Sequence, residues 1–220
     1  MDAGPAWIAY KKGLAEIVAA EVHDGETYYT AALFTKKDSM LKDIQDIKGK
    51  RIAFTSITGS SGFIVPVGRM IENGMIIPKY DNLVGVEEAL KETFEQYIFA
   101  GGYGQALDLV AKWKVDVAAG SLRFFETKAK PEIREEVKVM IKMGRVPTHV
   151  LVVSNELPEH LKVKITQVFL DLSVGENANI INQIYGIDGL ILTNAEDHLS
   201  EFGSAIDSIS GIAKKKWGIS

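Results

Sequence analysis

The sequence predicts an α/β protein in which parallel strands are joined by helices. Short β-branched runs alternate with segments of helical periodicity through the first two thirds of the chain, and this alternation is typical of parallel sheets with crossover helices. We expect strands at residues 16–22, 29–35, 51–54, 97–99, 115–118, 137–141 and 149–153. After Val153 the strand signal almost disappears, so a mostly helical tail to Ser220 is expected.

Helices are expected between the strands where apolar residues recur at helical spacing. Residues 62–73 form one of them, because Asn73-Gly74 is a common helix stop. Residues 104–113 and 157–172 each carry an apolar stripe. A short helical turn is expected at residues 42–48, before Gly49.

Composition excludes several classes of function. The net charge of −4 provides no broad basic field, so we expect no nucleic-acid partner. The chain has no cysteine, and its four histidines stand at no metal-ligand spacing, so we expect no metal and no cofactor. No stretch is long and apolar enough for a membrane-spanning helix. Residues 1–5 show no signal peptide, so the protein is either cytosolic or given in a mature or incomplete form.

The most informative segment is the run from Arg51 to Pro66, in which a strand leads through a loop of small residues into a helix. The first N–H groups of a helix have no partner within it, and the helix dipole favours an anion there. Glycines allow close approach to the backbone, and serine hydroxyls add donors. The alternative is that Ser60 or Ser61 only caps the helix. A nucleotide-type phosphate loop is excluded, because Phe63 stands where its lysine would be.

The run Phe54…Gly59-Ser60-Ser61-Gly62-Phe63…Pro66 resembles the D-P-x-S-T-S-G-x-x-x-P loop of the phosphonate/phosphite/phosphate ABC-transporter substrate-binding proteins. Further segments resemble the family in order and spacing. They are Asp2-Ala-Gly-Pro5-Ala, Tyr29-Thr30-Ala31 with Lys37-Asp38-Ser39, Ile44…Ile47-Lys-Gly-Lys50, Gly101-Gly102-Tyr103, Lys114-Val115-Asp116-Val117 and Arg145-Val146-Pro147. The similarity covers nearly the whole chain but begins about a third of the way into a usual member.

The resemblance implies a two-lobed, periplasmic-binding-protein-like (type II) fold whose first lobe is incomplete at its N-terminus. Lobe one would comprise residues 1–35 and 147–220, and lobe two residues 36–146. Hinge strands near residues 33–36 and 147–152 would let the lobes close on a ligand. The implied function is the solute-binding component of an ABC importer, with a small oxyanion (phosphonate, phosphite or phosphate) as ligand and a membrane permease as partner. The implied location is the periplasm or the extracellular face.

The resemblance also implies where the ligand binds. The expected ligand-binding residues are Tyr29, Gly59, Ser60, Ser61, Gly62, Tyr103 and Arg123. Three positions depart from the family pattern: Gly59 replaces a serine, Tyr103 a histidine and Gly104 an acidic residue. Arg123 lies near a position where some members carry a glutamate, and it is either a partner for a dianion or a solvated helix residue. The loss of acidic acceptors suits a fully ionised oxyanion or an organic ligand.

Two other functions stay open from the sequence. One is a ligand-sensing or vestigial binding module without a transport role. The other is an enzyme on the same scaffold, for which a serine such as Ser60 would need a neighbouring base. No histidine lies near Ser60 or Ser61 in sequence, although His149 could fold close to them.

Overall fold

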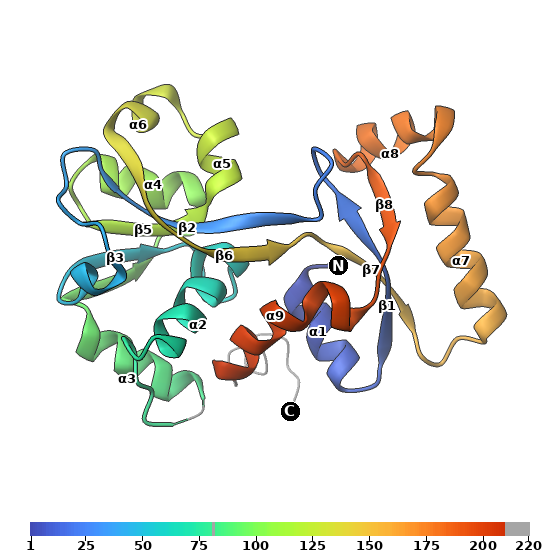
Figure 1. Ribbon diagram of the computed structural model, residues 1–220, viewed down its shortest axis with the longest axis horizontal. Helices are drawn as coiled ribbons and strands as arrows, with labels where there is room; N and C mark the ends of the chain where they lie inside the picture. Colours follow the sequence, from blue (N-terminus) through green and yellow to red (C-terminus); the bar gives the residue numbers. More distant parts are fainter. Residues whose placement is uncertain (81, 210–220) are drawn as a thin grey trace. The chain divides into compact units, whose positions relative to one another are not determined.

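The computed structural model describes residues 1–80 and 82–209 (Figure 1). The chain divides into two compact units, one made of Met1–Tyr28 with Pro147–Gly203 and the other of Tyr29–Val146 with the chain from Ser204. We call them unit 1 and unit 2. Both combine strands with helices, as predicted for an α/β protein. The expected lobe limits stay a prediction, and residues 210–220 of the expected helical tail lie outside the described residues.

Unit 2 is built on a five-stranded sheet. Its strands, in spatial order, are β4 (Gln96–Phe99), β3 (Arg51–Phe54), β5 (Val117–Ser121), β2 (Tyr28–Lys36) and β6 (Val137–Pro147). Strand β3 pairs in parallel with both β4 and β5, so the predicted parallel pairing is correct for these three strands. Strand β2 runs antiparallel to β5. Nearly every residue of β3 and β5 is buried, as expected for strands covered on both faces.

Helices cover both faces of this sheet (Figure 1). Those on one face are α4 (Tyr103–Ala111), α5 (Leu122–Thr127) and α6 (Pro131–Glu136), and those on the other are α2 (Val65–Glu72) and α3 (Leu83–Thr93). The predicted turn near residue 45 is a 3-10 helix at Ile44–Ile47. The packed interior includes Phe34, Phe54 and Phe63, whose side chains are fully buried.

Unit 1 has a smaller, antiparallel sheet. Strand β1 (Ala15–Val22) lies between β7 (Val150–Ser154) and β8 (Gly189–Leu192) and runs antiparallel to both. The expectation of parallel strands is wrong here. Strand β8 was not predicted, because it is four residues long and its last two side chains are exposed, which leaves no alternation to detect.

The helices of unit 1 lie before and after these strands. They are α1 (Ala3–Lys11), α7 (Glu159–Asp171), a 3-10 helix (Gly175–Asn177) and α8 (Ala178–Tyr185), and α9 (Ala195–Ser208) follows β8 and continues into unit 2. Helix α7 is the one predicted at residues 157–172. Among the described residues, no helix is long and apolar enough to cross a membrane.

Candidate functional site

The predicted ligand residues lie along one edge of the sheet in unit 2. Strands β3, β4 and β5 are parallel, so their carboxyl ends meet at the same edge, where open α/β sheets bind ligands. The segments at these strand ends include the first helical residues that follow, and for β5 its last residue and the first turn of the next helix. These segments, called loops for brevity, are residues 55–62, 100–105 and 121–125, and they contain every predicted ligand residue except Tyr29. We call these three loops the carboxyl edge.

Tyr29 reaches the same edge from an antiparallel strand. Ala31 of β2 lies opposite Ser121, the last residue of β5. Because β2 runs in the opposite direction, Tyr29 lies two residues beyond the end of β5. Its side chain is half-buried. The fold therefore places Tyr29 beside the end of β5, although it is far from that strand in sequence.

Two hydroxyl groups join the loops that follow β3 and β4. The Oγ of Ser61 lies 2.7 Å from the hydroxyl oxygen of Tyr103, and Ser61 is fully buried. The Tyr103 ring also packs against Phe124, with 5.3 Å between ring centroids. Tyr103 thus contacts residues that follow β3 and β5, while its own position is set by the end of β4.

The helix after β3 begins with a π-helical turn at Ser60–Ile64, two residues earlier than predicted. The N–H of Ile64 donates to the carbonyl of Gly59 at 2.9 Å, a step of five residues. Pro66 has no N–H, so the carbonyl of Gly62 cannot accept the usual α-helical bond and instead accepts one from the N–H of Thr55, at 3.2 Å. A π-turn of this kind is frequent at functional sites.

This turn leaves donors at its start. The first hydrogen bond of the turn is the one from the Ile64 N–H to the Gly59 carbonyl. The N–H groups of residues 60–63 come before it in the chain, so they have no acceptor within the helix. The partial positive charge of the helix N-terminus adds to their attraction for an anion. Ser60 and Gly59 are half-buried, whereas Ser61 is fully buried. Of the two serine hydroxyls, that of Ser60 is therefore the more accessible.

Arg123 lies in the first turn of α5, which begins directly after β5. The helix is capped by Ser121, whose Oγ accepts a hydrogen bond from the N–H of Phe124 at 3.2 Å. Arg123 is half-buried. The cap residue was not among the predicted site residues, although Gly120-Ser121 before an amphipathic run is a recognisable helix start.

Charge is distributed unequally between the two edges of the sheet. The three loops of the carboxyl edge contain Arg123 and no aspartate or glutamate. The opposite edge carries Asp116, whose two oxygens accept hydrogen bonds from Arg51 at 2.8 and 3.0 Å. These hydrogen bonds hold the pKa of the Asp116 carboxyl below its usual value.

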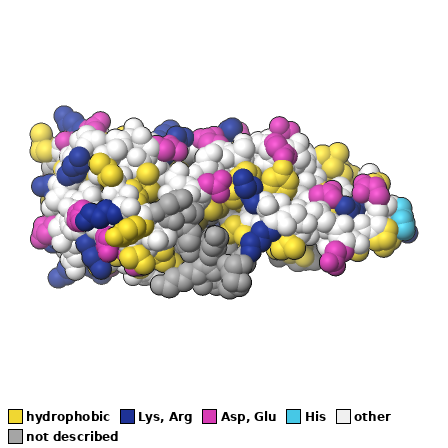
Figure 2. All heavy atoms as spheres, turned by 90° about the horizontal axis from the view of Figure 1, so that it is seen from below, with side chains coloured by type: hydrophobic (Ala, Val, Ile, Leu, Met, Phe, Trp, Pro, Cys, Tyr) yellow, Lys and Arg dark blue, Asp and Glu magenta, His cyan; other side chains and the backbone are white. Residues whose placement is uncertain are grey.

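On the face drawn in Figure 2, acidic and basic side chains are interspersed. This distribution agrees with the small net charge of −4. An anion at the carboxyl edge would therefore be attracted by nearby donors and not by a broad basic field.

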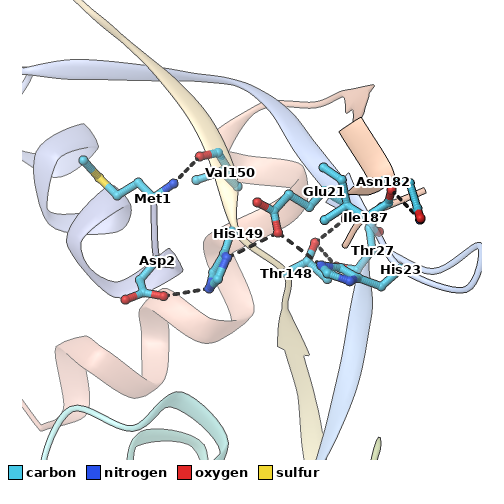
Figure 3. A network of polar contacts seen from close by, with 10 residues as sticks. All are labelled: Met1, Asp2, Glu21, His23, Thr27, Thr148, His149, Val150, Asn182 and Ile187. Carbon is cyan, nitrogen blue, oxygen red and sulfur yellow. Dashed lines mark hydrogen bonds and ion pairs between the residues drawn. The ribbon is translucent and has the colours of Figure 1, made fainter. Parts of the chain in front are cut away.

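A second polar network lies in unit 1 (Figure 3). His149 contacts Asp2 through Nε2 at 2.8 Å and Glu21 through Nδ1 at 3.3 Å. The hydrogen bond to Asp2, followed by that to Glu21, raises the pKa of His149 to about 9. The neighbouring Thr148 hydroxyl donates to the backbone carbonyls of Glu21 and Thr27. The network thus links residues 148 and 149, just before β7, to Glu21 near the end of β1 and to Thr27 just before β2.

The same network bears on the enzyme alternative. A general base must be unprotonated at the working pH. With a pKa of about 9, His149 is a cation near pH 7, and both of its ring nitrogens face carboxylates. It therefore does not have the chemistry of a base for Ser60 or Ser61.

Comparison with known proteins identifies the family of the chain. Residues 1–198 match the family described as ABC transporter, phosphonate, periplasmic substrate-binding protein. The chain belongs to this family. The resemblance inferred from the sequence motifs is thereby confirmed, and the family is one of substrate-binding proteins, not of enzymes.

Solved structures confirm the periplasmic-binding-protein-like fold. A Xanthomonas citri protein bound to chloride superimposes with a TM-score of 0.77 at 17% identity, covering 93% of this chain and 74% of that one. The same protein bound to ATP gives a TM-score of 0.78 at 16% identity, covering 93% and 75%. A binding protein component of an ABC phosphonate transporter from Pseudomonas aeruginosa gives 0.65 at 21% identity, covering 89% of this chain and 63% of that one.

Proposed function

We propose that this protein binds a small phosphorus oxyanion (phosphonate, phosphite or phosphate) at the carboxyl edge of unit 2 and presents it to an ABC permease. Membership of a phosphonate-transporter family supports a solute-binding role and a periplasmic location. The ligand itself is the finer part of the proposal. It rests on the donors of the edge and on their charge.

The observation that carries the proposal is the group of hydrogen-bond donors at the start of the π-turn. The N–H groups of residues 60–63 have no acceptor within the helix, and the first residue of the turn, the half-buried Ser60, adds a side-chain hydroxyl. Tyr29 and Arg123 follow at the ends of the neighbouring strands. An oxyanion carries several acceptor oxygens on one atom, so it can use donors from several loops together.

The absence of acidic side chains from the three loops supports an ionised ligand. A carboxylate near the site would repel an anion or would have to share a proton with it. None is present in residues 55–62, 100–105 or 121–125. A guanidinium at Arg123 adds a permanent positive charge that can bind two oxygens at once.

Isothermal titration calorimetry with methylphosphonate, phosphite, phosphate and sulfate tests the proposal. We expect one of the three phosphorus oxyanions to bind with a Kd of about 1 µM or lower, and sulfate to bind more weakly. Ser60→Ala and Arg123→Gln should each weaken binding by about 10- to 100-fold, because each removes a charge-assisted hydrogen bond of about 1.5–3 kcal/mol.

The matched control is Arg134→Gln on α6. Arg134 is exposed, and its guanidinium donates to the backbone carbonyl of Glu126 outside the three loops. Its substitution should leave the Kd within about twofold, since surface changes of this kind have small effects. Binding of none of the four anions would refute the proposed ligand class. Equal losses in Arg134→Gln and Arg123→Gln would refute the placement of the site.

A further inference from the structure

The loop that follows β3 is folded around a threonine that was not among the predicted site residues. Thr55 is the first residue after β3, and it is buried with 6% of its surface exposed. Its N–H donates to the carbonyl of Gly62 at 3.2 Å, and its carbonyl accepts from the N–H of Gly101 at 2.8 Å. The Thr55 backbone therefore connects the π-turn to the loop after β4.

The Thr55 side chain fills the space that the two glycines of the π-turn leave. A Cβ atom at Gly59 would lie within 3.0 Å of Thr55 Oγ1. A Cβ atom at Gly62 would lie 2.6 Å from Thr55 Cγ2 and 2.7 Å from Thr55 Cβ, and closer still to Oγ1. Real Cβ atoms do not approach other heavy atoms this closely.

Backbone conformation does not explain these glycines. Gly59 has a φ of −67°, which any residue can adopt. Gly62 is not among the glycines with positive φ. The need for glycine at both positions therefore arises from the contact with Thr55 and not from a left-handed turn.

From this contact we infer that Thr55 is the positioning residue of the anion-binding turn. Its side chain fixes how closely residues 59–62 approach the end of β3, and so fixes where the N–H groups at the start of the turn lie. The inference rests on the proposed function for its binding consequence. Its structural part, the steric coupling of Thr55 to the two glycines, stands without any ligand.

A set of single and double substitutions tests the coupling. Thr55→Ala removes Oγ1 and Cγ2 but keeps Cβ. It therefore removes the atom that blocks an alanine at position 59, where the remaining close atoms belong to Ser56 at 3.3 Å. It does not make room at position 62, because the Thr55 Cβ stays 2.7 Å away. Thr55→Ala should thus rescue Gly59→Ala and fail to rescue Gly62→Ala.

Two readouts separate positioning from folding. The first is the position of the amide signals of residues 60–62 in 1H–15N NMR spectra, which needs no ligand. The second is the Kd for methylphosphonate from titration calorimetry. We expect Gly59→Ala to shift the loop amides and weaken binding at least tenfold. The Thr55→Ala/Gly59→Ala protein should return to within threefold of Thr55→Ala alone in Kd, with matching amide positions.

Two controls complete the design. Thr55→Val keeps the branched shape without the hydroxyl, so it should not rescue Gly59→Ala. Arg134→Gln, the exposed control on α6 outside the carboxyl edge, should leave the amides of residues 60–62 unchanged. If Gly59→Ala does not fold, recovery of a folded double variant with alanine at position 55, and not with valine, supports the inference equally.

The outcomes distinguish the inference from the proposed function. A wild-type protein that binds none of the oxyanions refutes the proposed function, while the NMR comparison still tests the coupling. A Gly59→Ala protein with wild-type loop amides overturns the inference. So does a double variant whose amide shifts and loss of stability are the sum of those of the two single variants.

Discussion

Removal of the Tyr103 hydroxyl tests how the carboxyl edge is held together. Ser61 is fully buried and its Oγ lies 2.7 Å from the Tyr103 hydroxyl oxygen. In Tyr103→Phe the buried Ser61 hydroxyl loses this partner, and an unsatisfied buried hydroxyl costs about 1–3 kcal/mol. We expect the free energy of unfolding to fall by about 2 kcal/mol. For a unit of this size, that corresponds to a midpoint of thermal unfolding about 8 °C lower.

The double variant Ser61→Ala/Tyr103→Phe gives the sharper result. With both hydroxyls gone, no buried polar group is left unsatisfied at this contact, so stability should return to within about 1 kcal/mol of the wild type. The coupling energy of the cycle should be about 1–2 kcal/mol. Urea unfolding followed by circular dichroism measures all four proteins.

The control for this cycle is Tyr80→Phe. Tyr80 has 58% of its surface exposed, so loss of its hydroxyl should change the free energy of unfolding by less than about 0.5 kcal/mol. A Tyr103→Phe protein as stable as the control would refute the reasoning. So would a double variant whose loss equals the sum of the two single losses, because the two hydroxyls would then be energetically independent.

Three other changes have expected outcomes. Gly203→Ala should lower the free energy of unfolding by at least ~2 kcal/mol in urea titrations, because its Cβ would lie 2.5 Å from indole carbons of Trp7. Asp116→Asn should lower it by about 2 kcal/mol, because the partly buried Arg51 guanidinium loses its charged partner. The third concerns pH. The pKa of His149 is about 9 in the folded protein and 6.5 ordinarily, so the protonated ring stabilises the folded state. This contribution to the free energy of unfolding is complete below pH 6.5, declines as pH rises and is absent above about pH 9. In thermal unfolding from pH 6 to 10, His149→Gln should remove this decline, which is about 1 kcal/mol after allowance for solvent screening of the half-exposed ring.

Each of these has a contrary result. A fully stable Gly203→Ala protein would mean that α9 does not pack closely on Trp7. Equal stability of Asp116→Asn and wild type at pH 7 would mean that the ion pair contributes nothing. If the pH profile of His149→Gln keeps the alkaline decline of the wild type, another group causes that decline.

The central strands of unit 2 could be predicted because their local and tertiary signals agree. Strand β3 has the predicted bounds, since a buried run of Ile52, Ala53 and Phe54 ends in a loop of small residues. Strand β5 begins two residues later than predicted and extends through Ser121. Its residues Ala119-Gly120-Ser121 have low β-propensity. They form a strand because β5 lies between two other strands, β3 and β2.

The sequence could predict that the expected ligand residues lie together at one sheet edge, whereas their role in binding stays a prediction. Parallel strands place their following loops together, and this rule needs only the order of strands and helices. The contacts within the edge could not be predicted in the same way. The Ser61–Tyr103 hydrogen bond joins residues 42 positions apart, and the Thr55 contact depends on how the π-turn folds back over the end of β3.

The glycines of the loop show why a small-residue motif is ambiguous in sequence alone. Gly59 and Gly62 were expected to admit a ligand to the backbone, yet the space on their Cβ side is occupied by Thr55. Ser61 is buried and its hydroxyl is hydrogen-bonded to that of Tyr103, so Ser60 is the more exposed of the two serines. A loop can therefore keep an anion-binding pattern while most of its small residues serve packing. Under the proposed function, the affinity for an oxyanion then depends on how rigidly that packing holds the remaining donors.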